Sequence, residues 1–289
     1  MKIERAEVLG YCMGVRRAVE IAEKACKENP DKKIFTLGPL IHNNSALEIF
    51  KKKGINILKE DAGDLKNDFN NSVVIVRAHG VMPIVIDNLK TKGVSVMDAT
   101  CPRVLSSQKR AADYAKKGYT VFLAGDKNHG EIVGISGHAR SYGAECIVIE
   151  HKDDALAVQN VPEKSVLLSQ TTISKSEYDV IADVLKAKNS NIVILNTICP
   201  ATNERQKALV KLCKNVDGVL IIGGKNSANT KRLLRTAQEL CNHAFLIETA
   251  KEIPKLFFSL KRVGLTAGAS TPDFVIDEVE AALENHNAE

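Results

Sequence analysis

Three cysteines recur at similar intervals along the chain. Each follows an apolar stretch and precedes a run of helix-forming residues, in the segments AEVLGYCMGVRRAV, VSVMDATCPRVLSSQ and NIVILNTICPATNERQ. They are Cys12, Cys101 and Cys199, separated by 89 and 98 residues, close to a third of the 289-residue chain each time. A cysteine at a strand-to-helix turn has its thiolate favoured by the helix dipole, so each of the three is a competent metal ligand.

Basic residues follow each of these cysteines and also favour the thiolate form. They are Arg16 and Arg17, Lys109 and Arg110, and Arg205 and Lys207. Three thiolates without a fourth can hold an iron–sulfur cluster in which one iron keeps an open position, and that iron can bind substrate as a Lewis acid. The cysteine pattern therefore predicts a cluster that takes part in chemistry.

A second feature repeats in step with the cysteines. After each helical run, a β-rich stretch ends in glycine and a polar residue follows four positions later, in FTLGPLIH, FLAGDKNH and LIIGGKNS. These polar residues are His42, His129 and Ser227, which lie 30, 28 and 28 residues after the preceding cysteine. The agreement indicates an internal repeat.

A third feature repeats as well, because a further polar residue follows another β-rich stretch in each repeat. These residues are His79, Thr171 and Ser270, at 67, 70 and 71 residues after the cysteine. Each repeat thus reads strand, cysteine, helix, strand, glycine and polar residue, helix, strand, polar residue, helix. This alternation predicts parallel βαβ units whose sheets are covered by helices.

We therefore expect an α/β fold of three pseudo-symmetric units arranged around an approximate threefold axis. The units would be residues 1–100, 101–198 and 199–289, with nominal boundaries because no linker separates them. In parallel α/β sheets, ligands bind beyond the carboxyl ends of the strands. The three cysteines and six polar residues are accordingly expected to point into one central cavity.

The polar residues of the repeats are suited to bind phosphate oxygens. Histidine, serine and asparagine side chains can donate hydrogen bonds, and the segment GGKNSAN leads into a helix whose N-terminus favours anions. The expected cradle residues are His42, His79, His129, Ser227, Asn229 and Ser270. The nucleotide-binding patterns GxxxxGK[ST] and GxGxxG are absent, so a nucleotide is not indicated.

One carboxylate lies close to a repeat position in the second unit. Glu131 follows His129 by two residues in NHGE. A glutamate at a helix start commonly complements the helix dipole at the surface. Facing a closed cavity beside Thr171, it would instead deliver protons. The residues alone leave both interpretations open.

Composition excludes several classes of protein. Hydrophobic residues make up 44% and charged residues 26%, which excludes a disordered or collagen-like chain. The net charge of +5 is spread in interleaved signs without an aromatic-rich basic motif, so no nucleic-acid partner is expected. The start MKIERAEVLGYC is charged where a signal peptide is apolar, and no run of eighteen apolar residues occurs. We expect a cytoplasmic protein without a membrane partner.

The other cysteines and histidines fall outside the repeat positions. Cys26 and Cys213 both lie fourteen residues after a repeat cysteine, where the second unit has Ala115, so they are interpreted as packing residues. Cys146 and Cys241 receive no role. Structural or surface positions are expected for His138, His151, His243 and His286.

The three cysteines have two alternative uses. A zinc site with three cysteines and one histidine lacks its spacing signature. Redox sensing by the thiols alone would leave the six polar residues without explanation.

Taken in order, the motifs resemble a known enzyme family. YCMGVRRAV, GPLIHN, RAHGV, DATCP, NHGE, SQTT, TICPATNERQ, GGKNSAN and AGAST are similar to those of the 4-hydroxy-3-methylbut-2-enyl diphosphate reductases, the IspH/LytB family, from Cys12 to Asp273. The resemblance implies an iron–sulfur oxidoreductase that removes the hydroxyl group of (E)-4-hydroxy-3-methylbut-2-enyl diphosphate. The products would be isopentenyl and dimethylallyl diphosphate, in the last step of the methylerythritol phosphate route to isoprenoids.

The same resemblance implies a cofactor and roles for the repeat residues. It implies a cloverleaf of three α/β units around a [4Fe-4S] cluster held by Cys12, Cys101 and Cys199, with one iron lacking a protein thiolate. Glu131 matches the family's proton donor and Thr171 the residue that positions it. The residues matching those that bind the diphosphate are His42, His79, Ser227, Asn229 and Ser270, with His129 lining the same pocket.

One departure from the family pattern is visible, because Ala228 stands where many members have serine. The serine hydroxyl is missing there, but the backbone N–H of Ala228 can still donate to phosphate, and activity is expected to survive. The reaction consumes two electrons delivered singly, and a small acidic ferredoxin or flavodoxin would suit the positive net charge.

Two other functions remain as alternatives. A non-catalytic iron–sulfur redox sensor that binds a phosphorylated small molecule would use the same cysteines, yet it gives Glu131 and Thr171 no role. A hydrolase or phosphatase is disfavoured because no nucleophile elbow, HExxH pair or carboxylate cluster is present.

Overall fold

The structure is a computed structural model that describes residues 1–58, 69 and 71–285. The chain divides into two compact parts. The terminal part comprises Met1–Arg16, Ile41–Lys53 and Pro200–Glu289, and the middle part comprises Arg17–Leu40 and Gly54–Cys199. The strands of the described residues form three four-stranded sheets in which every strand pair is parallel. This confirms the predicted α/β class with three similar units.

Sheet B lies in the middle part and has the strand order β3-β2-β4-β5. Its strands are β2 (Lys33–Leu37), β3 (Ile55–Leu58), β4 (Ser72–Val76) and β5 (Ser95–Asp98). Helix α1 (Met13–Glu28) precedes β2, and α3 (Pro83–Thr91) joins β4 to β5. Val74 and Val76 of β4 pack against Val85 and Leu89 of α3. All five residues of β4 are buried, as expected for a strand covered on both faces.

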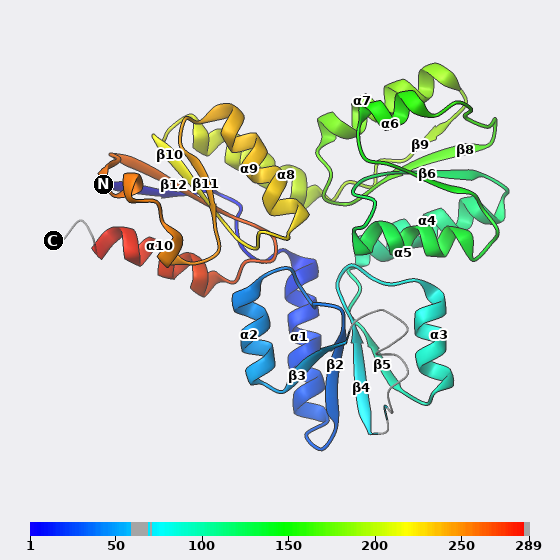
Figure 1. Cartoon of the computed structure of the whole chain (residues 1–289), viewed down its shortest axis with the longest axis horizontal. Helices are drawn as coiled ribbons and strands as arrows, with labels where there is room; N and C mark the ends of the chain where they lie inside the picture. The colour runs from blue at the N-terminus through cyan, green and yellow to red at the C-terminus, as the bar shows by residue number, and fades with distance from the viewer. Residues whose placement is uncertain (59–68, 70, 286–289) are drawn as a thin grey trace. The chain divides into compact units, whose positions relative to one another are not determined.

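Sheet C, also in the middle part, has the order β7-β6-β8-β9. Its strands are β6 (Thr120–Ala124), β7 (Cys146–Ile149), β8 (Ser165–Ser169) and β9 (Val193–Ile194). The helices are α4 (Pro102–Lys116), α5 (Gly130–Arg140), α6 (Lys152–Ala157) and α7 (Lys175–Lys188). Phe122 packs with residues of α6 and α7, whereas Val121 and Leu123 pack with residues of α4 and α5. The helix pairs cover opposite faces of the sheet (Figure 1), because successive strand residues point to opposite sides.

Sheet A belongs to the terminal part and has the order β1-β12-β10-β11. Its strands are β1 (Lys2–Arg5), β10 (Gly218–Ile222), β11 (Ala244–Ile247) and β12 (Arg262–Ala267). The helical elements of this part are α2 (Asn44–Lys52), α8 (Pro200–Cys213), α9 (Ala228–Leu240), α10 (Asp273–Asn285) and the short η2 (Ala250–Glu252) and η3 (Lys255–Ser259). Leu220 packs with residues of α10, and Val219 packs with residues of α8 and α9. None of the helices in the described residues is long and apolar enough to cross a membrane.

The first strand of the chain pairs with the last, since β1 lies beside β12 with Lys2 opposite Arg262. Each repeat cysteine therefore follows the edge strand of one sheet: Cys12 follows β1, Cys101 follows β5 and Cys199 follows β9. The sequence pattern predicted three strands per repeat, and the structure adds a fourth at the opposite edge, namely β3, β7 or β11. The ranges 1–100, 101–198 and 199–289 stay a prediction of domain boundaries.

Candidate active site

Each repeat cysteine is tied by its backbone N–H to the end of the neighbouring strand. The hydrogen bonds run from Cys12 to the carbonyl of Ala269 at 3.1 Å, from Cys101 to that of Ala78 at 2.9 Å, and from Cys199 to that of Thr171 at 2.9 Å. The acceptors are Thr171 itself and the residues just before His79 and Ser270. All seven cysteines are free thiols, and these three are half-buried. Each cysteine is thus held beside one of the polar residues of the third repeated feature, namely Ser270, His79 or Thr171.

Glu131 and Thr171 form a buried pair in the middle part. The backbone N–H of Thr171 donates to Oε1 of Glu131 at 2.6 Å, and the Thr171 hydroxyl donates to Oε2 at 2.8 Å. Glu131 lies in the first turn of α5 and is only 1% exposed. Since Cys199 donates to the Thr171 carbonyl, the cysteine, threonine and glutamate form one hydrogen-bonded series. The buried arrangement favours the proton-donor interpretation of Glu131 over a surface role.

Two histidines lie next to this pair. His129 is the N-cap of α5, and its Nδ1 accepts from the backbone N–H of Glu131 at 3.2 Å. A neutral imidazole that accepts at Nδ1 carries its proton on Nε2, which makes Nε2 a donor for a ligand oxygen. The ring of His79 lies edge-on to that of His129, with centroids 4.9 Å apart. The structure therefore brings together two of the predicted histidines with Glu131.

A guanidinium group lies against the start of α5. A Cβ atom on Gly130 would come within 2.2 Å of the Arg77 Nη2 atom, so only glycine lets Arg77 approach this closely. Arg77 comes two residues before His79 in RAHG. Arg77 was not among the predicted site residues. Its place directly after an apolar strand was the feature of the sequence that could have indicated it.

In the terminal part, His42 lies against two loops that follow strands of sheet A. The Ser270 hydroxyl donates to the backbone carbonyl of His42 at 3.1 Å. A Cβ on Gly224 would lie 2.2 Å from the same carbonyl oxygen, so the GGKNSAN loop packs directly on it. Ser270 and the loop that carries Ser227 are therefore both held close to the His42 backbone.

The start of α9 offers donors for an anion. Ser227 is the N-cap and accepts from the backbone N–H of Thr230 at 3.3 Å. Asn229 is 5% exposed, and its Nδ2 finds no acceptor among the residues that the structure describes. A buried amide donor without a partner is costly unless a ligand or water satisfies it. Together with the helix dipole, this donor points to an anionic ligand.

Two carboxylates that the sequence interpretation missed shape these loops. Oε1 of Glu150 accepts from the backbone N–H of Lys127, and Oε1 of Glu248 accepts from that of Lys225, each at 2.8 Å and across 23 residues. Oε2 of Glu248 also accepts from Asn44 Nδ2 at 3.0 Å. The recurrence of Ile-Glu at the ends of β7 and β11 was the available signal. These bonds show that the loops after β6 and β10 are built alike.

The predicted site residues form one group in each part of the chain. The terminal part holds Cys12, His42, Ser227, Asn229 and Ser270. The middle part holds His79, Cys101, His129, Glu131, Thr171 and Cys199. All of them follow the carboxyl ends of parallel strands.

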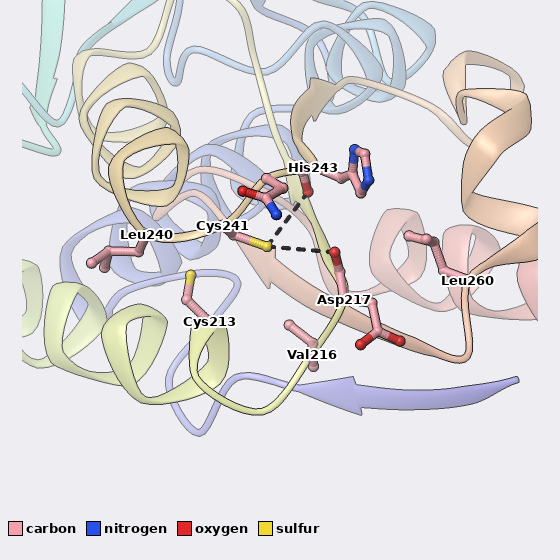
Figure 2. A pocket seen from close by; sticks show the side chains of 8 residues that line it. Cys213, Val216, Asp217, Leu240, Cys241, His243 and Leu260 are labelled. Carbon is pink, nitrogen blue, oxygen red and sulfur yellow. Dashed lines mark hydrogen bonds between the residues drawn. The ribbon is translucent and has the colours of Figure 1, made fainter.

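Figure 2 shows a pocket of about 390 Å³ lined by Cys213 and Cys241 at the other end of sheet A. Asp217 and His243, which also line it, directly precede β10 and β11, so the pocket lies at the amino ends of these strands. Burial, reinforced by the nearby Cys241 thiol, raises the pKa of Cys213 to about 11. The pocket is therefore separate from the predicted site residues, which follow carboxyl ends.

The remaining residues without a predicted role occupy varied positions. Cys146 donates weakly to Ser136 at 3.4 Å, and burial raises the pKa of its thiol. Burial lowers the pKa of His138, and His151 is the N-cap of α6. His286 lies outside the described residues. Their structural interpretation stays a prediction.

Comparison with known proteins identifies the family. Residues 3–284 match the family model described as LytB protein. This chain belongs to the LytB family. The match covers every site residue named above and agrees with the resemblance carried by the motifs.

Relatives of this LytB family member carry consistent names. The chain is 48% identical to the 4-hydroxy-3-methylbut-2-enyl diphosphate reductase of Treponema denticola, over 98% of this chain and 99% of the relative. It is 37% identical to the enzyme of that name from Caldanaerobacter subterraneus, over 100% and 99% of the two chains.

The fold is also similar to solved structures. One is of (E)-4-hydroxy-3-methyl-but-2-enyl diphosphate reductase, described as the terminal enzyme of the non-mevalonate pathway, with a TM-score of 0.71, 36% identity, and coverage of 99% of this chain and 100% of that one. Another is the E-1-hydroxy-2-methyl-but-2-enyl-4-diphosphate reductase of Plasmodium falciparum, with a TM-score of 0.88, 28% identity, and coverage of 98% and 87%.

Proposed function

We propose that this LytB family member is a 4-hydroxy-3-methylbut-2-enyl diphosphate reductase. It converts (E)-4-hydroxy-3-methylbut-2-enyl diphosphate to isopentenyl and dimethylallyl diphosphate, in the last step of the methylerythritol phosphate route. The reaction takes up two electrons and two protons, replaces a C–O bond with a C–H bond and releases water. The observation that carries the proposal is the buried Glu131–Thr171 pair, in which the Thr171 carbonyl also accepts a hydrogen bond from the backbone N–H of Cys199.

We assign a [4Fe-4S] cluster to Cys12, Cys101 and Cys199, with one iron lacking a protein thiolate. The residues suit this group because all three thiols are free, half-buried and held at the carboxyl ends of parallel sheets. Cys101 also caps α4, where the helix dipole favours its thiolate. When bound, such a cluster supplies electrons one at a time and a Lewis-acidic iron.

We assign diphosphate binding to the residues of the expected cradle. A phosphate oxygen gives Asn229 Nδ2 the acceptor that it lacks among the described residues, and the N-terminus of α9 adds backbone N–H groups and a favourable dipole. The Ser270 hydroxyl can rotate from the His42 carbonyl toward a phosphate oxygen. The assignment also includes Ser227, His42 and His79, with Nε2 of His129 as a further donor.

Glu131 supplies the proton that lets the hydroxyl oxygen leave as water. Its carboxyl group is buried, so bulk water does not compete for the proton. Thr171 fixes the orientation of that group through two hydrogen bonds, which keeps the acid aimed in one direction. Fixing the diphosphate end of the substrate limits its motion while the proton is transferred.

A one-electron donor is the partner of this reaction. A small acidic ferredoxin or flavodoxin suits the net charge of +5, because opposite charge accelerates encounter between proteins. We place the reaction in the cytoplasm, where such donors are found.

The test is anaerobic reconstitution of the chain, followed by measurement of iron and sulfide and of the oxidation of reduced methyl viologen. We expect a cluster, and viologen oxidation that depends on the hydroxylated diphosphate and yields both products. A cluster without substrate-dependent oxidation would favour the non-catalytic sensor. A chain that binds no iron would overturn the cofactor assignment.

A further inference from the structure

The segment that leads into each repeat cysteine runs past the end of a neighbouring strand. We call this place a cysteine seam, and define it by two residues: the one two positions before the cysteine and the last residue of the neighbouring strand. The residues before the cysteines are Gly10, Ala99 and Thr197. Their counterparts are Ala267 of β12, Val76 of β4 and Ser169 of β8.

The seams of sheets B and C close by direct contact. In sheet B, the backbone N–H of Ala99 donates to the Val76 carbonyl at 3.0 Å. In sheet C, the Thr197 hydroxyl donates to the Ser169 carbonyl at 2.8 Å and accepts from the Ser169 N–H at 2.7 Å. Both seams thus hold the segment that leads into Cys101 or Cys199.

The seam of sheet A is closed by a third residue. Gly10 and Ala267 each present a carbonyl oxygen, and two carbonyls cannot bond to one another. Arg205 of α8 donates from Nη1 to Ala267 at 2.8 Å and from Nη2 to Gly10 at 2.9 Å. Its side chain is deeply buried, with the residue 2% exposed.

The length of the segment between strand and cysteine explains why the seam of sheet A needs an added side chain. Six residues separate the end of β1 from Cys12, whereas two separate β5 from Cys101 and four separate β9 from Cys199. The longer segment leaves the sheet register after Ala6, whose N–H still donates to the Leu265 carbonyl at 2.8 Å. Arg205 fills the interval that follows.

We propose that Arg205 is a positioning residue that fixes the Cys12 loop against the end of β12. The inference rests on the proposed function, because it concerns a cluster ligand and a diphosphate residue. The backbone N–H of Cys12 donates a hydrogen bond to the carbonyl of Ala269. Ala269 lies two residues after Ala267, whose carbonyl accepts from Arg205, and Ser270 follows Ala269 directly. One guanidinium therefore sets the spacing between the thiol of Cys12 and the hydroxyl of Ser270.

The charge of Arg205 adds to this geometric role. A guanidinium keeps its charge when buried, and here it lies beside loops that carry a thiolate ligand and a phosphate ligand. A second arginine makes a comparable contact in the middle part, where Arg17 Nη1 donates to the carbonyl of Thr100 at 3.0 Å, just before Cys101. Lysine cannot replace the fork, since one ammonium does not match two carbonyls in the same way.

The test uses Arg205→Met and Arg205→Lys in the full-length chain. Before reconstitution, iodoacetamide labelling of each cysteine is followed by mass spectrometry. In Arg205→Met, we expect Cys12 to be labelled at least about fivefold faster, because its loop opens more often, with Cys101 and Cys199 unchanged. Arg205→Lys keeps one contact and should fall between this variant and wild type. Arg262→Met is the matched control, because Arg262 bonds to Asp217 at the amino end of sheet A.

The reconstituted enzyme gives a second readout. Arg205→Met should lose iron to a chelator faster than wild type, and its KM for the diphosphate should rise more than its kcat falls. Unchanged labelling of Cys12 would overturn the proposal, as would an equal increase at all three cysteines, which marks general destabilisation. If Arg205→Met does not fold, wild-type labelling of Cys12 in Arg205→Lys would also overturn it. The labelling result does not depend on turnover, so failure of the proposed reaction is distinguished from failure of this inference.

Discussion

Both carboxylate oxygens of Glu131 are bonded to a single residue, Thr171, one through its backbone N–H and one through its hydroxyl. A carboxyl group held at both oxygens has little rotational freedom, so an acid in this position would deliver a proton along a fixed direction. The Thr171 carbonyl accepts from Cys199. Through Thr171, the proposed acid and a proposed cluster ligand share one short piece of backbone.

Replacing Glu131 tests the acid directly. Glu131→Gln keeps the size of the side chain but removes the acidic proton, so we expect the turnover rate to fall by about 10² to 10⁴-fold. Cluster content should stay at the wild-type level, because the glutamate is not a thiolate ligand. The measurement is kcat with an artificial donor, normalised to iron content.

Glu163→Gln is the matched control for that variant. Glu163 lies in the same part of the chain, at an exposed position away from the site loops. We expect turnover close to that of wild type. Wild-type turnover in Glu131→Gln itself, with the cluster intact, would show that another group supplies the proton.

Cluster binding and diphosphate binding should separate by mutation. Cys101→Ser removes a thiolate ligand, so the reconstituted protein should lose its brown colour and its activity. His79→Ala should keep the visible absorption of the cluster and bind the diphosphate more weakly. Absorption spectra and substrate titrations of the two variants measure this, with Cys146→Ser as a coloured, active control. A colourless His79→Ala would contradict the division of roles.

Much of this arrangement could be predicted from the sequence, because a threefold pattern constrains many residues at once. The offsets of His42, His129 and Ser227 from their cysteines placed them at equivalent loops, and in the structure each lies five residues after the end of a strand. Arg205 could not be assigned in this way. It was interpreted as a cation near Cys199, whereas its hydrogen bonds reach Gly10, 195 residues away in the chain.

Other features depend on contacts that no local pattern encodes. β1 pairs with β12 across almost the whole chain, so the first strand of the first repeat completes the third sheet. Glu248 bonds to the backbone of Lys225 and to Asn44, and only the folded chain brings these three together. A single sequence indicates such long-range contacts only where the same residues recur in several repeats. The Ile-Glu pair that ends in Glu150 and again in Glu248 is an example.

Two glycines should differ sharply in their tolerance of alanine. A Cβ on Gly224 would lie 2.2 Å from the backbone carbonyl of His42, which cannot move without displacing the cradle. A Cβ on Gly130 would meet the end of the Arg77 side chain, which can rotate away. We expect Gly224→Ala to raise the KM for the diphosphate by at least about tenfold, a cost near 1.4 kcal/mol, and Gly130→Ala to have a smaller effect. Equal KM values in the two variants would contradict the packing argument.

The Cys213 thiol should be unreactive at neutral pH. Burial and the neighbouring Cys241 raise its pKa to about 11, so the thiol stays protonated until the solution is strongly alkaline. Labelling of Cys213 by iodoacetamide should therefore rise as the pH approaches 11 instead of levelling off near the usual thiol pKa of about 8.5. Mass spectrometry of the peptide at several pH values measures this. A plateau below pH 9 would show that the thiol is better solvated than the pocket indicates.

Asn229 should contribute to substrate binding at some expense of stability in the free protein. Its buried Nδ2 has no acceptor among the described residues, so Asn229→Ala removes an unsatisfied donor and should not lower the melting temperature of the ligand-free chain. With the diphosphate bound, the same change removes a hydrogen bond to a charged group, and we expect KM to rise by about 10 to 100-fold with kcat nearly unchanged. Asn229→Asp should bind still more weakly, because it places a negative charge against phosphate.

Asn242→Ala is the control for these variants, because Asn242 is an exposed amide in the same part of the chain. It should leave both the melting temperature and KM unchanged. A drop in ligand-free stability with an unaltered KM would show that Asn229 supports the fold of the loop and does not bind the substrate.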